Sequence, residues 1–123
     1  MGIFGVGIDI VEVKRIQESL ERFGGKFKER IFTKSEQEFC ESRNGKFQSY
    51  AARFASKEAF SKALGTGLRG VVSWRDIVVI DNEKSRPKLE IYGRANTILN
   101  KRKALLSISH TKNYATAIVI IEE

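Results

Sequence analysis

The sequence of 123 residues has little of what small proteins use for covalent or metal stabilisation. Cys40 is its only cysteine, so no disulfide can form within the chain, and a reducing cytoplasm is the simplest expectation. We expect Cys40 to pack in the core rather than act as a nucleophile. With one cysteine and one histidine, His110, the chain has no zinc-ligand spacing.

Long apolar runs, repeats and linkers are also lacking. No segment approaches the roughly 20 apolar residues of a membrane-spanning helix. No basic start followed by an apolar segment marks a secretory signal. With 41% hydrophobic and 30% charged residues, the composition is that of a globular protein. We therefore expect one domain over residues 1–123, with no membrane partner.

Acidic residues are fewer than basic residues in this chain. Lysine and arginine total 22 against 15 aspartates and glutamates, which gives a net charge of +7. Residues 84–103 contain seven basic residues and one acid, Glu90. Such an excess suggests an acidic partner, although it is also compatible with a simple basic surface. A basic nucleic-acid-binding module is one alternative, but the sequence has no RNP-like aromatic pattern and no helix-turn-helix signature.

The hydrophobic pattern predicts an α+β protein, with an antiparallel sheet packed against a long helix and shorter helices. In the first helix, Val13, Ile16, Leu20 and Phe23 form the apolar stripe, and Gly24–Gly25 ends it. The predicted elements are a strand at 3–11, helices from 12 to 23, 33–43 and 47–64, strands at 76–81 and 88–92, a helix at 93–103, and strands at 104–110 and 114–121.

The first strand carries an acid on an open face. Gly5, Gly7 and Asp9 share this face, so another backbone or a ligand can approach it closely. The alternative role for Asp9 is the N-cap of the next helix, with Glu12 completing a capping box.

The long helix carries a second acid beside lysines. Ala55, Ala59 and Ala63 form a small-residue face, and Glu58 ends a different, apolar stripe. Glu58 and Lys62 could form a surface ion pair worth about 0.2–0.5 kcal/mol. They could instead belong to a magnesium–diphosphate site, and their spacing alone does not decide.

Three separated segments resemble one known family: residues 5–15, residues 53–67 with a left-handed cap expected at Gly65, and residues 107–111 around His110. Their order and spacing are similar to those of the holo-acyl-carrier-protein synthases of the 4′-phosphopantetheinyl transferase superfamily. The resemblance covers essentially the whole chain and implies the fold of that superfamily. It also implies transfer of 4′-phosphopantetheine from coenzyme A to a serine of apo-acyl carrier protein, with release of adenosine 3′,5′-bisphosphate, in fatty acid biosynthesis.

The resemblance also implies roles for individual residues. Asp9 and Glu58 would bind magnesium, and Glu58 and Lys62 would be catalytic; the general base could be Glu58, a metal-bound water or a neighbouring residue. Members of this type are homotrimers with sites between subunits, and the strand at 114–121, apolar on both faces, fits such an assembly. Coenzyme A would contact Arg53, Lys57, Lys62, Gly65, Arg86, Pro87, Ser109, His110 and Thr111, and the carrier protein would contact Arg15, Arg22, Lys26, Phe27 and Arg30.

Overall fold

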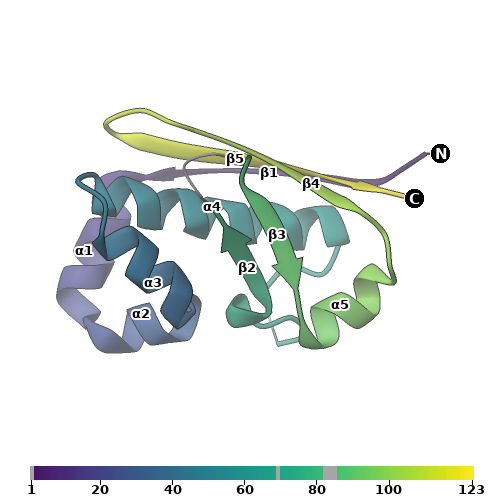
Figure 1. The fold of residues 1–123 in the computed structure, drawn as a ribbon, viewed down its shortest axis with the longest axis horizontal. Coiled ribbons are helices and arrows are strands. Elements are labelled where there is room, and N and C mark those ends of the chain that lie inside the picture. Colours follow the sequence, from purple (N-terminus) through teal and green to yellow (C-terminus); the bar gives the residue numbers. More distant parts are fainter. Residues whose placement is uncertain (1, 69, 82–85) are drawn as a thin grey trace.

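The computed structural model describes residues 2–68, 70–81 and 86–123, and Figure 1 shows their arrangement. The class predicted from the sequence, α+β with an antiparallel sheet against a long helix, is confirmed. One antiparallel sheet has the strand order β1-β5-β4, and β2 and β3 form a separate antiparallel pair. In chain order the elements are β1 (Ile3–Glu12), α1 (Val13–Phe23), α2 (Gly25–Ile31), α3 (Lys34–Glu41), α4 (Lys46–Leu64), the 3-10 turn η1 (Trp74–Asp76), β2 (Ile77–Ile80), β3 (Lys88–Ile91), α5 (Gly93–Leu99), β4 (Ala104–His110) and β5 (Tyr114–Glu122).

The long helix α4 packs directly against β1 and β5. This close approach requires glycine: a Cβ atom on Gly7 would lie 1.9 Å from the carbonyl oxygen of Ala59, and one on Gly5 would lie 1.9 Å from that of Ala63. The buried alanines of α4 provide the matching flat face. The predicted open face of the first strand is therefore confirmed, and α4 is the backbone that approaches it.

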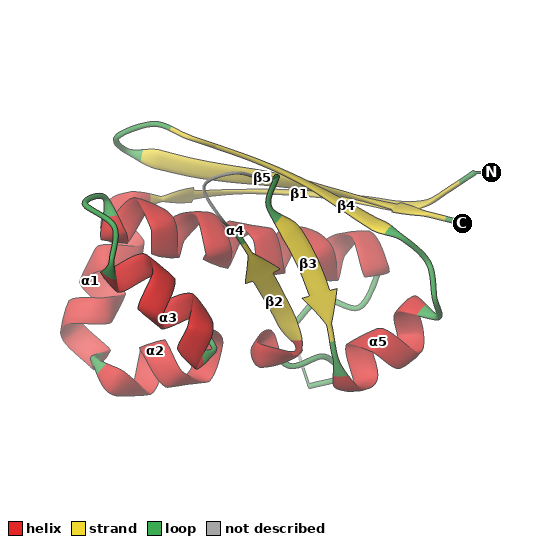
Figure 2. Ribbon diagram, viewed as in Figure 1, coloured by secondary structure: helices red, strands yellow, loops and turns green. Residues whose placement is uncertain are grey.

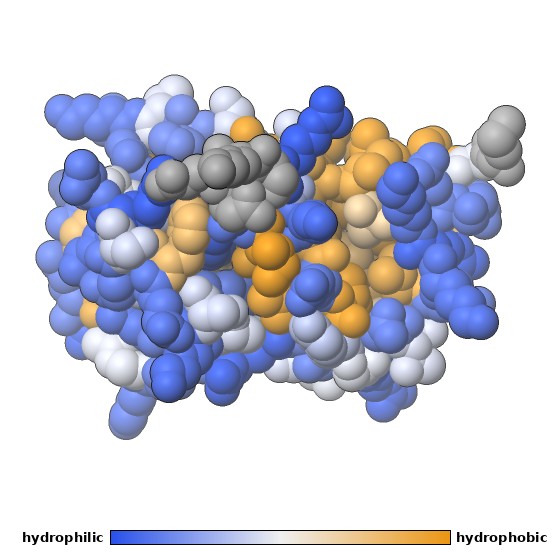
Figure 3. Space-filling model, in the orientation of Figure 1, coloured by the Kyte–Doolittle hydropathy of each residue, from blue (hydrophilic) through white to orange (hydrophobic). Residues whose placement is uncertain are grey.

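The remaining helices and the β2–β3 pair cover the other side of α4. The molecule therefore has three layers, with α4 between the sheet and these elements (Figures 1 and 2). Helix α3, helix α1 and strand β2 each contact α4. Phe32, Tyr50, Phe60 and Ile77 are completely buried, as is Cys40, whose predicted core position is confirmed. On the face seen in Figure 3, apolar side chains gather around the β2–β3 pair, whereas the surface over α1–α3 is mainly hydrophilic. No helix in the described part of the chain is long and apolar enough to cross a membrane.

The sheet face that points away from α4 is apolar but uncovered. Val6, Ile8 and Ile10 of β1 are 55%, 62% and 67% exposed. In β5, Val119 is buried against α4, whereas Ile118 on the outer face is only half-buried. The two-sided apolar character predicted for this strand is thus present in the fold. We call this surface the outer face.

Helix α2 was not predicted. The prediction that Gly24–Gly25 ends the first helix is correct, but the chain turns at Gly24, with φ of 55°, and a new helix starts at once. Of the predicted apolar stripe, Val13, Ile16 and Leu20 are buried, whereas Phe23 is the last residue of α1 and is 57% exposed. The guanidinium of Arg22 lies 5.4 Å from the centre of the Phe23 ring.

The predicted helix at 93–103 is too long. Helix α5 ends at Leu99, because Asn100 and Lys101 adopt left-handed backbone angles with φ of 52° and 65°. The loop predicted between β2 and β3 includes residues 82–85, which lie outside the described residues.

Candidate active site

Asp9 and Lys62 meet where β1 crosses α4. The Lys62 Nζ atom lies 3.1 Å from Asp9 Oδ1 and 3.0 Å from the carbonyl oxygen of Ile8. The alternative of Asp9 as a helix N-cap is wrong, because Asp9 lies inside β1 and Glu12 occupies the N-cap position of α1. The lysine therefore joins α4 to β1.

Asp9 and Glu58 open onto one cleft of about 440 Å³. Arg15 of α1, Phe27 of α2 and Phe54 of α4 line the same cleft. Four predicted site residues from three distant segments, Asp9, Arg15, Phe27 and Glu58, are thus brought together. Helix α1 packs against α4, and α2 packs against α1, which brings Arg15 and the ring of Phe27 to the two acids.

The donor set of this cleft suits a magnesium ion. Magnesium prefers carboxylate oxygens and commonly completes its shell with water and substrate phosphate oxygens. Within the described residues, no group of three or more histidine, cysteine, aspartate or glutamate side chains gathers at one place. The chain would therefore supply two carboxylates, Asp9 and Glu58, and leave the other positions to phosphate oxygens and water.

Arg53 and Lys57 do not lie in this cleft, although the resemblance implied contacts to coenzyme A for both. Arg53 is 2% exposed, and its guanidinium lies 4.2 Å from the ring centre of Phe39. The Arg53 Nε atom is buried and has no hydrogen-bond partner among the described residues. Lys57 is completely buried, and burial lowers the pKa of its ammonium group.

The other residues implied for coenzyme A are divided between the two faces of the sheet. Ser109 lies opposite Thr116, whereas Asp9 lies opposite Ala117, the next residue along β5. Because successive strand residues point to opposite faces, Ser109 faces away from α4 and Asp9 faces towards it. His110 and Thr111 follow Ser109 and are exposed.

Arg86 and Pro87 line a different cleft, of about 620 Å³, together with Leu105 and Ile120 of the sheet. Gly65 ends α4 with φ of 91°, which confirms its predicted left-handed cap. Among the described residues, the cleft of Arg86 and Pro87 shares no lining residue with the Asp9–Glu58 cleft.

The residues implied for the carrier protein lie on α1 and α2, at one end of α4 (Figure 1). Arg15 and Arg22 are exposed on α1, and both line a groove along that helix. Lys26 and Arg30 are exposed on α2, and Phe27 is half-buried. Of these residues, Arg15 and Phe27 line the Asp9–Glu58 cleft itself, and Arg22 shares the groove along α1 with Arg15.

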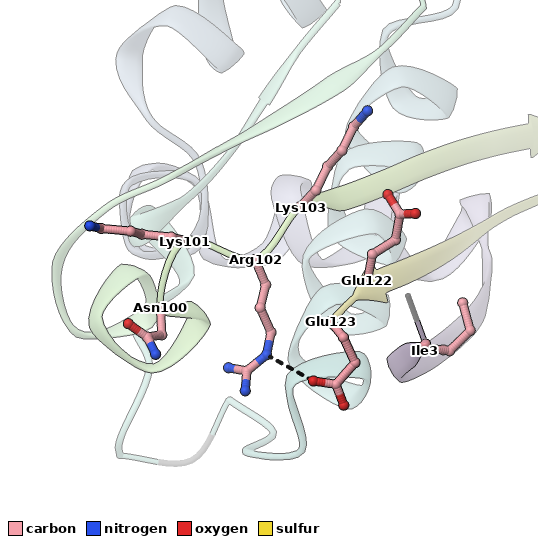
Figure 4. Close-up of a pocket in the computed structure, with 8 residues that line it drawn as sticks. Ile3, Asn100, Lys101, Arg102, Lys103, Glu122 and Glu123 are labelled. Carbon is pink, nitrogen blue, oxygen red and sulfur yellow. Dashed lines mark ion pairs between the residues drawn. The ribbon is translucent and has the colours of Figure 1, made fainter.

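The basic segment 84–103 ends at a separate pocket of about 510 Å³ (Figure 4). Lys101, Arg102 and Lys103 line it, but so do Glu122 and Glu123. Figure 4 shows the lysine side chains pointing apart, and Arg102 Nε lies 3.9 Å from Glu123 Oε2. The two carboxylates offset the cations here, and none of the predicted site residues is present.

A family model for the 4′-phosphopantetheinyl transferase superfamily matches residues 5–119. The chain belongs to this superfamily. Its membership confirms the resemblance seen in the three sequence segments, and it favours a transferase over a nucleic-acid-binding module.

Individual relatives agree with the family model. The holo-[acyl-carrier-protein] synthase of Koribacter versatilis is 48% identical over 124 residues, covering 98% of this chain and 99% of the relative. The structure of the synthase from Neisseria meningitidis gives a TM-score of 0.89 at 35% identity, covering 98% of this chain and 99% of that one. The predicted enzyme class is confirmed: the chain is a phosphopantetheinyl transferase of the holo-[acyl-carrier-protein] synthase type.

Two similar synthases were solved in complex with coenzyme A. The one from Bacillus anthracis, in complex with coenzyme A (3′,5′-ADP), gives a TM-score of 0.83 at 38% identity and covers 98% of this chain and 97% of that one. The one from Helicobacter pylori, in complex with coenzyme A, gives 0.85 at 35% identity and covers 95% of this chain and 99% of that one.

Proposed function

We propose that this enzyme transfers the 4′-phosphopantetheine arm of coenzyme A to a serine of an apo-acyl carrier protein, releasing adenosine 3′,5′-bisphosphate. Magnesium would be held by Asp9 and Glu58. The observation that carries the proposal is the common cleft of these two acids, with Lys62 bonded to Asp9 and Arg15 at its edge. Membership of the superfamily and the coenzyme A complexes of relatives support it.

The chemistry requires charge neutralisation and positioning more than a covalent intermediate. Bound magnesium would offset negative charge on the diphosphate and fix its oxygens. Lys62, whose side chain is 50% exposed, would add a positive charge near the 5′-phosphate of the leaving adenosine 3′,5′-bisphosphate while keeping Asp9 in place. The attacking hydroxyl belongs to the carrier protein, so the chain needs no nucleophile of its own.

Carrier-protein docking would use the basic residues of the first two helices. Arg15 and Phe27 line the cleft, and Arg22, Lys26 and Arg30 are exposed on the same two helices, α1 and α2. An acidic carrier protein would be attracted mainly through a faster association rate. The net charge of +7 would add to this attraction.

The complete enzyme would be a homotrimer with sites between subunits. The outer face exposes contiguous apolar side chains of β1 and β5, which a second copy would cover. Ser109 faces the opposite side of the sheet from Asp9, so a neighbouring subunit would bring Ser109, with the turn that carries His110 and Thr111, to the acids of another copy. A reducing cytoplasm, and a role in fatty acid biosynthesis, remain part of this proposal.

Mass spectrometry of an apo-acyl carrier protein incubated with the enzyme, coenzyme A and magnesium tests the reaction. The expected product is the carrier protein with one added phosphopantetheine group. Two controls, a carrier protein whose acceptor serine is replaced by alanine and a reaction with a metal chelator, should give none. Unchanged carrier protein in the complete reaction, despite measurable coenzyme A binding, would contradict the proposed acceptor.

A further inference from the structure

We propose that Lys57 is a positioning residue: with Glu36 it forms a buried ion pair that fixes the aromatic wall of the active-site cleft. The aromatic wall consists of Phe27, Phe54 and Trp74. The inference rests on the proposed function in one respect, the ligand of the cleft: if the function is correct, the wall contacts the incoming carrier protein.

The ion pair is completely enclosed and fully bonded. The Lys57 and Glu36 side chains are both 0% exposed, and Lys57 Nζ lies 2.9 Å from Glu36 Oε1. The same ammonium donates to the carbonyl oxygen of Trp74 at 3.0 Å and to that of Ile77. An ammonium group has three protons, so Lys57 has none left for a phosphate.

Both carboxylate oxygens of Glu36 also accept hydrogen bonds within the fold. Its Oε1 atom accepts a hydrogen bond from the backbone N–H of Thr33 at 2.9 Å, and its Oε2 atom accepts one from the N–H of Val79 at 2.8 Å. The pair therefore bonds to the start of α3, to α4 and to the segment 74–79. Three backbone groups of that segment form hydrogen bonds with the pair: the carbonyl oxygens of Trp74 and Ile77 and the N–H of Val79.

Fixing segment 74–79 also fixes the ring of Trp74. Its ring centre lies 4.9 Å from that of Phe54, and the ring planes are 30° apart. Phe54 in turn stacks with Phe27, at 6.5 Å and 18°. Phe27 and Phe54 line the cleft with Asp9 and Glu58, and Trp74 stacks on Phe54 without being among the residues that line the cleft.

The position of Lys57 in α4 explains why it can act in this way. It directly precedes Glu58 and follows Phe54 by three residues, so one helical turn carries the acid, the ring and the buried cation. Direct contact between Lys57 and coenzyme A stays a prediction, and the bonds of its ammonium group argue against it. A positioning role predicts instead that loss of Lys57 acts through the wall.

The test compares a double variant with the wild type. Lys57→Met/Glu36→Leu removes both charges together, because a single change would leave the other charge buried and unpaired. Trp74 is the only tryptophan of the chain, so its fluorescence reports on the wall alone. In the double variant we expect Trp74 to become clearly more accessible to acrylamide quenching, and the KM for apo-carrier protein to rise roughly tenfold. The KM for coenzyme A should change less than about twofold.

Val119→Ala is the matched control, because it shortens a buried side chain against α4 without touching the pair or the wall. It should lower the thermal midpoint but leave Trp74 quenching and both KM values unchanged. If the double variant behaves like this control, or loses coenzyme A affinity with unchanged quenching, the positioning role is overturned.

A second variant tests the inference even if the double variant does not fold. Trp74→Leu removes the support of Phe54 while keeping the ion pair, and it should raise the carrier-protein KM to a similar extent. A wild-type KM in Trp74→Leu would overturn the inference. Should the wild type transfer nothing to a carrier protein, the proposed function fails, while quenching of Trp74 in the double variant still tests the ion pair.

Discussion

Asp9 and Glu58 are the residues whose charge the proposed chemistry needs most. Asp9→Asn and Glu58→Gln keep the shape of each side chain but remove its negative charge and one of the two oxygens that could bind the metal. Each should lower the transfer rate about 10²-fold or more, as the loss of one electrostatic contact to the reacting groups does. A transfer assay with a magnesium titration, beside circular dichroism to verify the fold, measures this.

The exposed glutamate Glu38 of α3 provides the control, since Glu38→Gln removes an equal charge outside the cleft. It should retain the wild-type rate. Wild-type rates and metal dependence in both Asp9→Asn and Glu58→Gln would show that these acids do not form the metal site.

Arg15 is the residue through which charge should act on the carrier protein. Arg15→Glu should weaken carrier-protein binding more than coenzyme A binding, because the nucleotide is assigned to other residues. Added salt should weaken wild-type binding as well, since it screens exposed charges over about 8 Å at physiological ionic strength. Affinities measured against salt for both proteins test this; a carrier affinity indifferent to salt and to the substitution would exclude charge-guided docking at α1.

Among the elements, the contact of β1 with α4 tolerates no added side-chain atom. Gly7→Ala would place Cβ 1.9 Å from the carbonyl oxygen of Ala59, so the helix or the strand must shift. We expect a loss of unfolding free energy of about 1–3 kcal/mol or more. Because Asp9 and Lys62 lie at the same crossing, the transfer rate should fall too.

Gly25→Ala is the comparison for this change, measured by chemical denaturation. A Cβ atom on Gly25 meets nothing within 4 Å, and alanine is the better helix former by roughly 0.5–1 kcal/mol. Gly25→Ala should therefore be neutral or stabilising. Equal effects of the two substitutions would contradict the packing argument.

The elements also show how far the sequence could predict this fold. Periodic patterns located β1, α4 and the two C-terminal strands, and the glycines of β1 predicted the close approach of a backbone. Helix α2 was missed because Gly24–Gly25, a strong end signal, lies directly before it. The capping box of Thr33 and Glu36 was visible in the sequence. The pairing of Glu36 with Lys57 was not, because the 21-residue separation carries no periodic signal.

For the whole molecule, we expect the outer face to be the surface through which copies of the chain assemble. Light scattering should give about three times the chain mass of 13.9 kDa, as the proposed homotrimer predicts. Ile8→Glu, at a side chain that is 62% exposed in the single chain, should yield monomers with little activity. Val71→Glu, at an exposed apolar residue outside the sheet, should remain trimeric. A fully active wild-type monomer would refute both the trimer and the shared site.

Because Cys40 is buried, the rate at which its thiol is labelled reports how often the native state opens around it. Burial raises the pKa of this thiol to about 12, so at neutral pH almost no thiolate exists and no reagent reaches the sulfur. Labelling then requires opening around α3, and its rate measures how often this happens. A thiol reagent should react with the native enzyme about 10³-fold or more slowly than with the chain in denaturant. Equally fast labelling in both states would mean that this part of the core opens freely.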